Sequence, residues 1–190
     1  IRDWSVTGVQ TCALPICLMA DEKGLFIVPN RVTVSTAGIV PRIDDLAQIE
    51  DRPHLAISLT AATDELRDRL MPINRKWDLD ALMKAARNFE RSLKRGERFT
   101  FEYVMLGGVN DSPDDARTLA ELLKRYKLKR FKINLIPHNG AEKLDYDSAS
   151  PEAVAAFKQT LESLGVDAYV RTPRGRDIYA ACGQLAAKAA

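Results

Sequence analysis

From Arg31 onward, short stretches rich in Val, Ile, Leu, Phe or Thr alternate with longer stretches whose apolar residues recur at helical spacing. The short stretches predict five strands: Arg31–Thr36, His54–Thr60, Arg98–Leu106, Arg130–Pro137 and Asp167–Thr172. Strands that alternate with long helices join through right-handed crossovers, so the pattern predicts an α/β fold with parallel strands. Apolar residues on both faces of the second and fourth strands predict that helices cover one face and that the other face is also packed.

Three helices begin at recognisable caps. Ser112 and Ser150 each precede a proline and an acidic residue, which is a favoured order at the start of a helix. Asp78 begins a third helix, and Gly165 predicts the end of the helix that follows Ser150. The apolar face of the third helix is formed by Leu79, Leu82, Met83, Ala86 and Phe89.

Length and composition place the chain among soluble globular proteins. Its 190 residues suit one domain or a large part of one, and 46% of them are hydrophobic. The net charge of +2 leaves any affinity for nucleic acid to local clusters of Lys and Arg. Three scattered cysteines do not form a secreted-type disulfide framework, and no apolar run is long enough to span a bilayer. We therefore expect a cytoplasmic protein without a membrane partner.

The first sixteen residues follow neither pattern. The segment Val6–Ile16 resembles the translation of a sequencing adaptor, so Cys12 would have no biological meaning. We expect residues 1–16 to be an adaptor-derived artefact and residues 17–190 to be the C-terminal part of a larger domain, truncated on its N-terminal side.

Polar side chains occur where three of the predicted strands end, at Ser35–Thr36, Ser58–Thr60 and His138–Asn139. Parallel α/β folds bind their ligands at this edge. A single Ser or Thr there is more often a helix cap than a ligand contact, but three such segments together favour a binding site. His138 has no His or Cys at metal-ligand spacing, and we interpret it as a loop histidine with satisfied hydrogen bonds.

Basic residues gather at two places. The segment Lys124–Lys132 contains six Lys and Arg residues near a predicted helix end, and both a solvated surface and a phosphate-facing patch remain open for it. Arg171, Arg174 and Arg176 precede Cys182, where they favour a thiolate and would contact the phosphates of a nucleotide that approaches it. A small buried cysteine is the structural alternative for Cys182.

Seven segments resemble, in order, the radical S-adenosylmethionine RNA methyltransferases of dual ribosomal and transfer RNA specificity, which act on carbon 2 of adenine. The segments are Arg31–Pro41, Leu55–Ala61, Met71–Asn74, Phe101–Leu106, Asn110–Asp111, Lys132–Asn139 and Ala181–Leu185. The resemblance covers residues 24 to 186 and implies a partial radical-SAM-type (β/α) barrel, present here as a C-terminal fragment.

The resemblance also implies the site residues. S-adenosylmethionine would be held by Ser35, Ser58, Leu59, Thr60 and Asn139, although histidine is frequent in the family where this chain has Thr60. Cys182 would be catalytic, as an S-methylcysteine intermediate from which a radical transfers the methyl group to adenine.

The implied cofactors include a 4Fe-4S cluster, whose family ligands form a C-x-x-x-C-x-x-C motif. This sequence lacks that motif, a glycine-rich S-adenosylmethionine segment and the second, resolving cysteine, so we assign no metal ligand and expect the fragment to be inactive alone. The implied partners are ribosomal RNA, transfer RNA as a second substrate, and a reductase or flavodoxin-type electron donor. The full-length form is expected to be monomeric.

Two alternatives stay open. One is a non-catalytic RNA-binding α/β module, and another is a radical methyltransferase that acts on a different adenine carbon. A barrel lyase or aldolase would need a lysine with supporting acids or a cluster of metal ligands, and Lys132 lacks supporting acids. Truncation would leave the edge of Arg31–Thr36 unpaired, so we expect poor solubility of the fragment.

Overall fold

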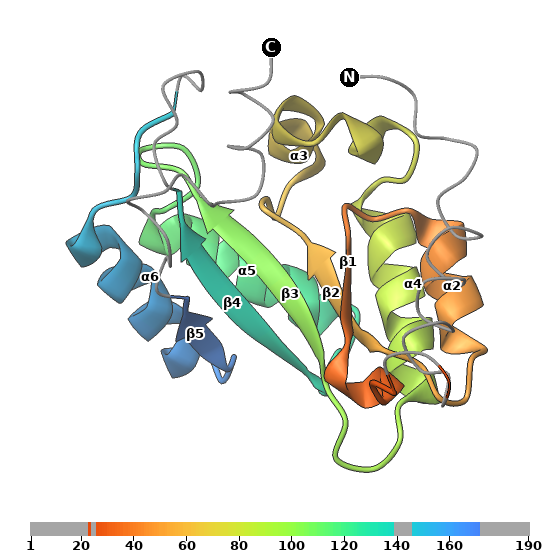
Figure 1. The fold of residues 1–190 in the computed structure, drawn as a ribbon. Coiled ribbons are helices and arrows are strands. Elements are labelled where there is room, and N and C mark those ends of the chain that lie inside the picture. Colours follow the sequence, from red (N-terminus) through yellow and green to blue (C-terminus); the bar gives the residue numbers. More distant parts are fainter. Residues whose placement is uncertain (1–22, 24–25, 139–145, 172–190) are drawn as a thin grey trace.

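One sheet of five parallel strands organises the described part of the chain, which comprises residues 23, 26–138 and 146–171 of the computed structural model (Figure 1). Its strands are β1 (Thr33–Thr36), β2 (His54–Ser58), β3 (Phe99–Met105), β4 (Phe131–Pro137) and β5 (Ala168–Val170). Each strand pairs in parallel with the next strand in the sequence. This order is the order of strands in a (β/α) barrel, so the predicted parallel α/β fold and its five strands are confirmed.

Five α-helices connect or follow these strands: α2 (Val40–Ala47), α3 (Asp64–Leu70), α4 (Leu79–Ser92), α5 (Pro113–Arg125) and α6 (Pro151–Ser163). Two short 3₁₀ helices, η1 (Pro29–Arg31) and η2 (Pro72–Arg75), complete the described elements. The predicted caps are confirmed, because Asp78, Ser112 and Ser150 each accept a hydrogen bond from the backbone N–H three residues later. Gly165 ends α6 with φ +79°, as predicted.

The sequence did not reveal α2 and α3. Both are short, and five of the seven residues of α3 are charged, a composition without an apolar stripe. Their formation depends on tertiary contacts, since isolated helices of this length are marginal in water.

The core lies between the sheet and helices α4, α5 and α6. The ring of Phe99 packs against the rings of Phe89, Phe101 and Phe131, with centroids 5.0 to 6.3 Å apart. All four rings are buried, and further along β3 the Tyr103 ring packs against Phe157 of α6, with centroids 5.2 Å apart. These closely packed aromatic rings hold the amino-terminal ends of β3 and β4 firmly against the helices.

The opposite face of the sheet carries many polar residues, together with a few apolar ones such as Ala56 and Ile136. Along β4, Phe131, Ile133 and Leu135 are buried toward the helices, whereas Lys132 is exposed and Asn134 is half-buried on the other side. The expectation that β4 is packed on both faces is therefore wrong for the described residues. From Phe131 to Leu135, apolar and polar residues alternate, so one face is buried against the helices and the other is exposed or half-buried.

Some sequence predictions fall outside the described ranges. Residues 1–16, with their expected foreign origin, are among them. In the described part of the chain, β1 is an edge strand that pairs only with β2. The expected poor solubility caused by this unpaired edge stays a prediction. None of the described helices has both the length and the apolar composition needed to cross a bilayer.

Candidate functional site

A row of polar side chains crosses the open face of the sheet near the carboxyl ends of the strands. The strand register places Ser58 of β2 beside Glu102 of β3, Glu102 beside Asn134 of β4, and Asn134 beside Tyr169 of β5. Ser35 of β1 pairs with Ala56 and lies one step closer to the amino ends on the same face. Side chains alternate between faces along a strand, so this row points away from the helices.

The chain leaves β2 through a tight turn at Thr60. The Leu59 N–H still donates to the Glu102 carbonyl over 2.8 Å, but the Ala61 N–H turns back to the Leu59 carbonyl over 2.7 Å. Thr60 has φ +60°, a left-handed conformation that is costly for a β-branched residue. This turn ends the strand at Ser58, two residues earlier than predicted.

Arg67 of α3 lies under this turn, and its side chain is completely buried. Its guanidinium donates to the carbonyls of Leu59 (3.2 Å), Ser58 (3.2 Å) and Ala37 (2.8 Å). These carbonyls belong to the segments that leave β1 and β2. One side chain therefore ties together the two strand ends that carry Ser35 and Ser58.

Asn74 of η2 completes the environment of Arg67. Its Oδ1 accepts a hydrogen bond from Arg67 Nη1 over 2.8 Å, and its Nδ2 donates to Asp64 and Asp68. Burial lowers the pKa of Arg67 to about 10, an effect that the charges of Asp64 and Asp68 partly offset. Arg67 is thus a cation at neutral pH, matched by two nearby carboxylates.

Asn110, in the loop after β3, holds the turn from the other side and is also completely buried. Its Nδ2 donates to the carbonyls of Thr60 and Val104, each over 2.8 Å, and its Oδ1 accepts from the Leu106 N–H. The Tyr103 hydroxyl donates to the Asn110 carbonyl over 3.0 Å. The Thr60 turn is therefore bonded directly to the end of β3.

Arg171 extends the polar row at the end of β5. Its Nη1 lies 3.5 Å from Glu102 Oε1, and its backbone N–H donates to the Leu135 carbonyl. The Arg171 side chain is 64% exposed, so this ion pair contributes little to stability but leaves the guanidinium available to a ligand. Its predicted contact with RNA stays a prediction.

Of the predicted site residues, Ser35, Ser58, Leu59 and Thr60 lie together at the ends of two adjacent strands. The other predicted site residues lie outside the described residues: Asn139, Arg174, Arg176 and Cys182. Across the described ranges, no group of three or more His, Cys, Asp and Glu side chains is arranged to hold a metal ion. The His138 Nε2 atom is buried without a hydrogen-bond partner among the described residues, contrary to the expected satisfied histidine.

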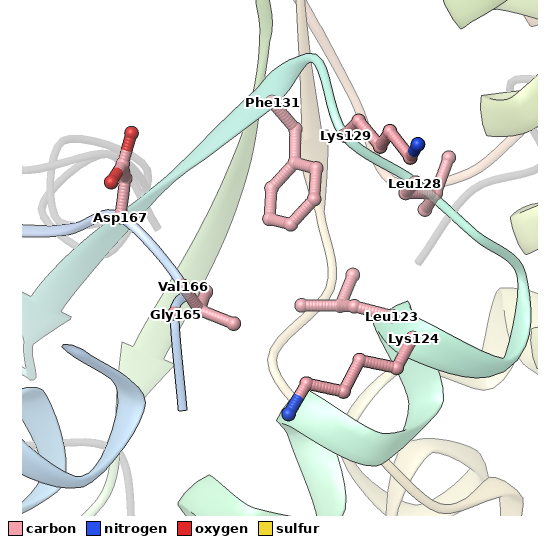
Figure 2. A pocket seen from close by; sticks show the side chains of 8 residues that line it. All are labelled: Leu123, Lys124, Leu128, Lys129, Phe131, Gly165, Val166 and Asp167. Atoms are coloured by element: carbon pink, nitrogen blue, oxygen red, sulfur yellow. The ribbon is translucent and has the colours of Figure 1, made fainter. Parts of the chain in front are cut away.

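A separate cavity of about 260 Å³ lies at the opposite end of the sheet (Figure 2). Lys124, Lys129 and Asp167 line it together with apolar residues such as Phe131. These residues belong to the carboxyl end of α5 and to the starts of β4 and β5, away from the polar row. Ligands of parallel α/β folds bind at the other edge, so we do not assign the cavity to the site.

Part of the basic segment Lys124–Lys132 has a structural role. Arg130 donates to the carbonyls of Leu93 and Lys94 at the end of α4, where helix carbonyls lack partners. The buried Glu90 carboxylate accepts from the backbone N–H groups of Lys129 and Arg130. These bonds join α4 to the start of β4, and Arg130 is therefore not free for phosphate.

Sequence reasoning assigned no role to four polar residues of this site: Arg67, Asn74, Glu102 and Asn110. Asn74 and Asn110 were visible only as parts of motifs in the family resemblance. Glu102 had one further signal in the sequence. A single acidic residue inside a largely apolar strand indicates the face of the sheet that does not pack against the core. Arg67 had no such signal within its charged helix.

The chain is similar to proteins named as RNA methyltransferases. The probable dual-specificity RNA methyltransferase RlmN of Koribacter versatilis (strain Ellin345) is 51% identical over 170 residues, which are 90% of this chain and 47% of that protein. The dual-specificity RNA methyltransferase RlmN of Anaeromyxobacter dehalogenans (strain 2CP-C) is 48% identical over 183 residues, 96% of this chain and 48% of that protein. The chain thus spans about half the length of the curated relatives it matches. No family model matches it.

Solved structures agree with these relatives. A radical SAM methyltransferase from Sphaerobacter thermophilus superposes with a TM-score of 0.86 at 39% identity, over 92% of this chain and 50% of that one. A domain of pyruvate-formate lyase-activating enzyme from Bacteroides vulgatus shares the fold at 17% identity, with a TM-score of 0.57 over 74% of this chain and 80% of that one. Over about nine-tenths of its length, this chain is therefore similar to about half of proteins named as RlmN RNA methyltransferases and to about half of a radical SAM methyltransferase of known structure.

Proposed function

We propose that the chain is the C-terminal part of an enzyme that methylates carbon 2 of adenine in ribosomal RNA and in transfer RNA. The observation that carries this proposal is the 51% identity with a protein named as an RlmN methyltransferase, which extends over 90% of the chain. The polar row at the strand ends supports it, since parallel α/β folds bind ligands there.

The described residues fit S-adenosylmethionine. This ligand offers a ribose diol, an adenine edge and an amino-acid end, which require short neutral donors and acceptors on rigid strand ends. Ser35, Ser58 and the Leu59–Thr60 backbone provide such groups at adjacent strand ends. Asn139, outside the described residues, is proposed as a further contact. When bound, the ligand and a 4Fe-4S cluster supply a methyl group and the radical chemistry that its transfer to an unreactive carbon requires.

We assign the remaining roles as follows. Cys182 carries the methyl group on its sulfur before transfer, and we assign no cluster ligand to this chain. Arg171, Arg174 and Arg176 contact the phosphates that flank the target nucleotide. The full-length protein acts as a cytoplasmic monomer with a flavodoxin-type electron donor or a reductase.

The direct test is adenine methylation by the full-length protein in cells whose own enzyme of this family has been deleted. Nucleosides from ribosomal and transfer RNA are analysed by mass spectrometry. The wild type should restore 2-methyladenosine in both RNAs, and Cys182→Ala should not. Cys17→Ala is the matched control for loss of a thiol.

Three outcomes would change the proposal. If 8-methyladenosine appears instead, the enzyme acts on another adenine carbon. If Cys182→Ala retains full methylation, the proposed role of Cys182 is wrong. If the wild type binds RNA without making any methyladenosine, the alternative of a non-catalytic RNA-binding module is supported.

A further inference from the structure

We propose that Arg67 and Asn110 are positioning residues that hold the Ser58–Thr60 backbone in its ligand-binding conformation. This inference rests on the proposed function, in which that backbone binds S-adenosylmethionine. Neither side chain is expected to contact the ligand, because both are completely buried and occupied by bonds within the protein.

The Thr60 turn needs such support. A threonine at φ +60° is strained, and surrounding contacts must hold it in that conformation. The Ala61 N–H bonds back to Leu59 within the turn itself, so it cannot fix the turn relative to the rest of the sheet. Bonds to other elements must do this.

Arg67 supplies the first set of bonds, from α3. Its planar guanidinium reaches the carbonyls of Leu59, Ser58 and Ala37 at once, with distances between 2.8 and 3.2 Å. A lysine ammonium could not span these carbonyls with the same geometry, since it lacks the rigid fork. Arg67 therefore fixes the spacing between the ends of β1 and β2.

Asn110 supplies the second set, from the loop after β3. Its amide nitrogen donates to the Thr60 carbonyl, while the same side chain is bonded to Val104 and Leu106. Thr60 is thereby held to a strand end that is itself anchored in the core through Tyr103. Loss of the Asn110 amide should allow Thr60 to relax to a negative φ, which would move the Ser58–Thr60 carbonyls and amides.

The test measures the affinity of the full-length protein for S-adenosylhomocysteine by calorimetry. Asn110→Ala and Arg67→Lys should each weaken binding by about tenfold, which corresponds to about 1.4 kcal/mol. The double variant Thr60→Gly with Asn110→Ala should keep at least about a third of the affinity of Thr60→Gly alone. Glycine adopts positive φ without the penalty of a side chain, so the turn should no longer need the Asn110 amide. A merely structural role for Asn110 would not spare the affinity of the double variant.

Glu90→Ala is the matched control. It removes a buried side chain with backbone hydrogen bonds at the opposite end of the sheet, so it should lower the melting temperature and leave the affinity unchanged. If Asn110→Ala does not fold, Thr60→Pro replaces it, since proline cannot adopt φ +60°. Thr60→Pro should likewise weaken binding by about tenfold or more.

The outcomes separate the two proposals. The positioning roles would be overturned if the wild type binds S-adenosylhomocysteine and the folded variants bind it with an affinity within twofold of the wild type. The proposed function would then still stand. A larger loss of affinity in the double variant would also overturn the role of Asn110. Wild type that does not bind the probe would overturn the proposed function itself.

Discussion

Arg67 Nη2 donates a hydrogen bond to the Ala37 carbonyl over 2.8 Å and joins residues that are thirty positions apart in the sequence. Through this bond, helix α3 holds the segment that follows β1, while the same guanidinium holds the end of β2. The two strands that present Ser35 and Ser58 are therefore fixed to each other by one buried cation. Substitutions around this cation should have effects that depend on which bond they remove.

Replacement of Asn74 by alanine should destabilise the protein. It removes the acceptor of Arg67 Nη1 and the donor shared by Asp64 and Asp68, and leaves the buried Arg67 guanidinium with one partner fewer. We expect a loss of about 2–3 kcal/mol in the free energy of unfolding, measured by urea titration of the full-length protein. Asn88→Ala, at an exposed position of α4, is the control and should change it by less than about 0.5 kcal/mol. Equal effects of the two substitutions would contradict this account.

Gly38→Ala should be more harmful than a glycine substitution elsewhere with similar backbone geometry. Gly38 has φ +110°, and an added Cβ would lie 3.1 Å from Arg67 Nη2 and 3.2 Å from Leu82 Cδ1. Gly96 has φ +86° and no atom within 4 Å of such a Cβ. Both alanines incur the backbone strain of about 1–2 kcal/mol, but only Gly38→Ala should also disturb Arg67. A melting temperature that falls equally in both variants would show that the space around Gly38 is not restrictive.

Stability should fall at alkaline pH, in part through Tyr103. Burial, with smaller effects of Asp115 and Asp111, raises the pKa of Tyr103 well above its usual value of 10.0. The folded state keeps this proton while the unfolded chain releases it, so stability decreases as pH rises above about 10. This decrease amounts to about 1.4 kcal/mol per pH unit for one proton.

Tyr103→Phe should remove that part of the pH dependence. The variant lacks the hydroxyl that donates to Asn110, so it should be less stable at pH 8 but should lose less stability between pH 10 and 11. Urea titrations of both proteins at these pH values give the comparison. Parallel stability curves for wild type and variant would exclude Tyr103 as the titrating group.

Serine hydroxyls of the polar row should contribute to ligand binding without a large effect on stability. Ser58 is half-buried at the end of β2, and its substitution by alanine should weaken S-adenosylhomocysteine binding by about three- to tenfold through loss of one hydrogen bond. Ser163, whose hydroxyl bonds to its own helix at Thr160, provides a matched control. Unchanged affinity of Ser58→Ala would remove this hydroxyl from the site.

The regular elements could be predicted where local signals are strong. Ser112, Ser150 and Asp78 are caps with known preferences, and the three helices begin where these residues predict. The five strands were visible because β-rich stretches alternate with long helices. Their parallel order follows from that alternation.

The supports of the site could not be predicted in the same way. Arg67 lies among charged residues that suggest a solvated helix, and its burial depends on carbonyls contributed by two distant strands. Asn110 acts on Thr60 across fifty positions, and the positive φ of Thr60 has no local sequence signal, because threonine rarely adopts it. These features result from tertiary contacts rather than from local propensity.

The most direct test of the central claim is a crystal structure of the full-length protein with S-adenosylhomocysteine. Our account predicts that the Ser35 and Ser58 hydroxyls or the Leu59–Thr60 backbone lie within hydrogen-bond distance of the ligand, and that Cys182 Sγ faces the same edge of the sheet. A ligand bound elsewhere, for example in the cavity lined by Lys124 and Lys129, would contradict it. A Cys182 sulfur buried among aliphatic side chains away from Ser58 would contradict it equally.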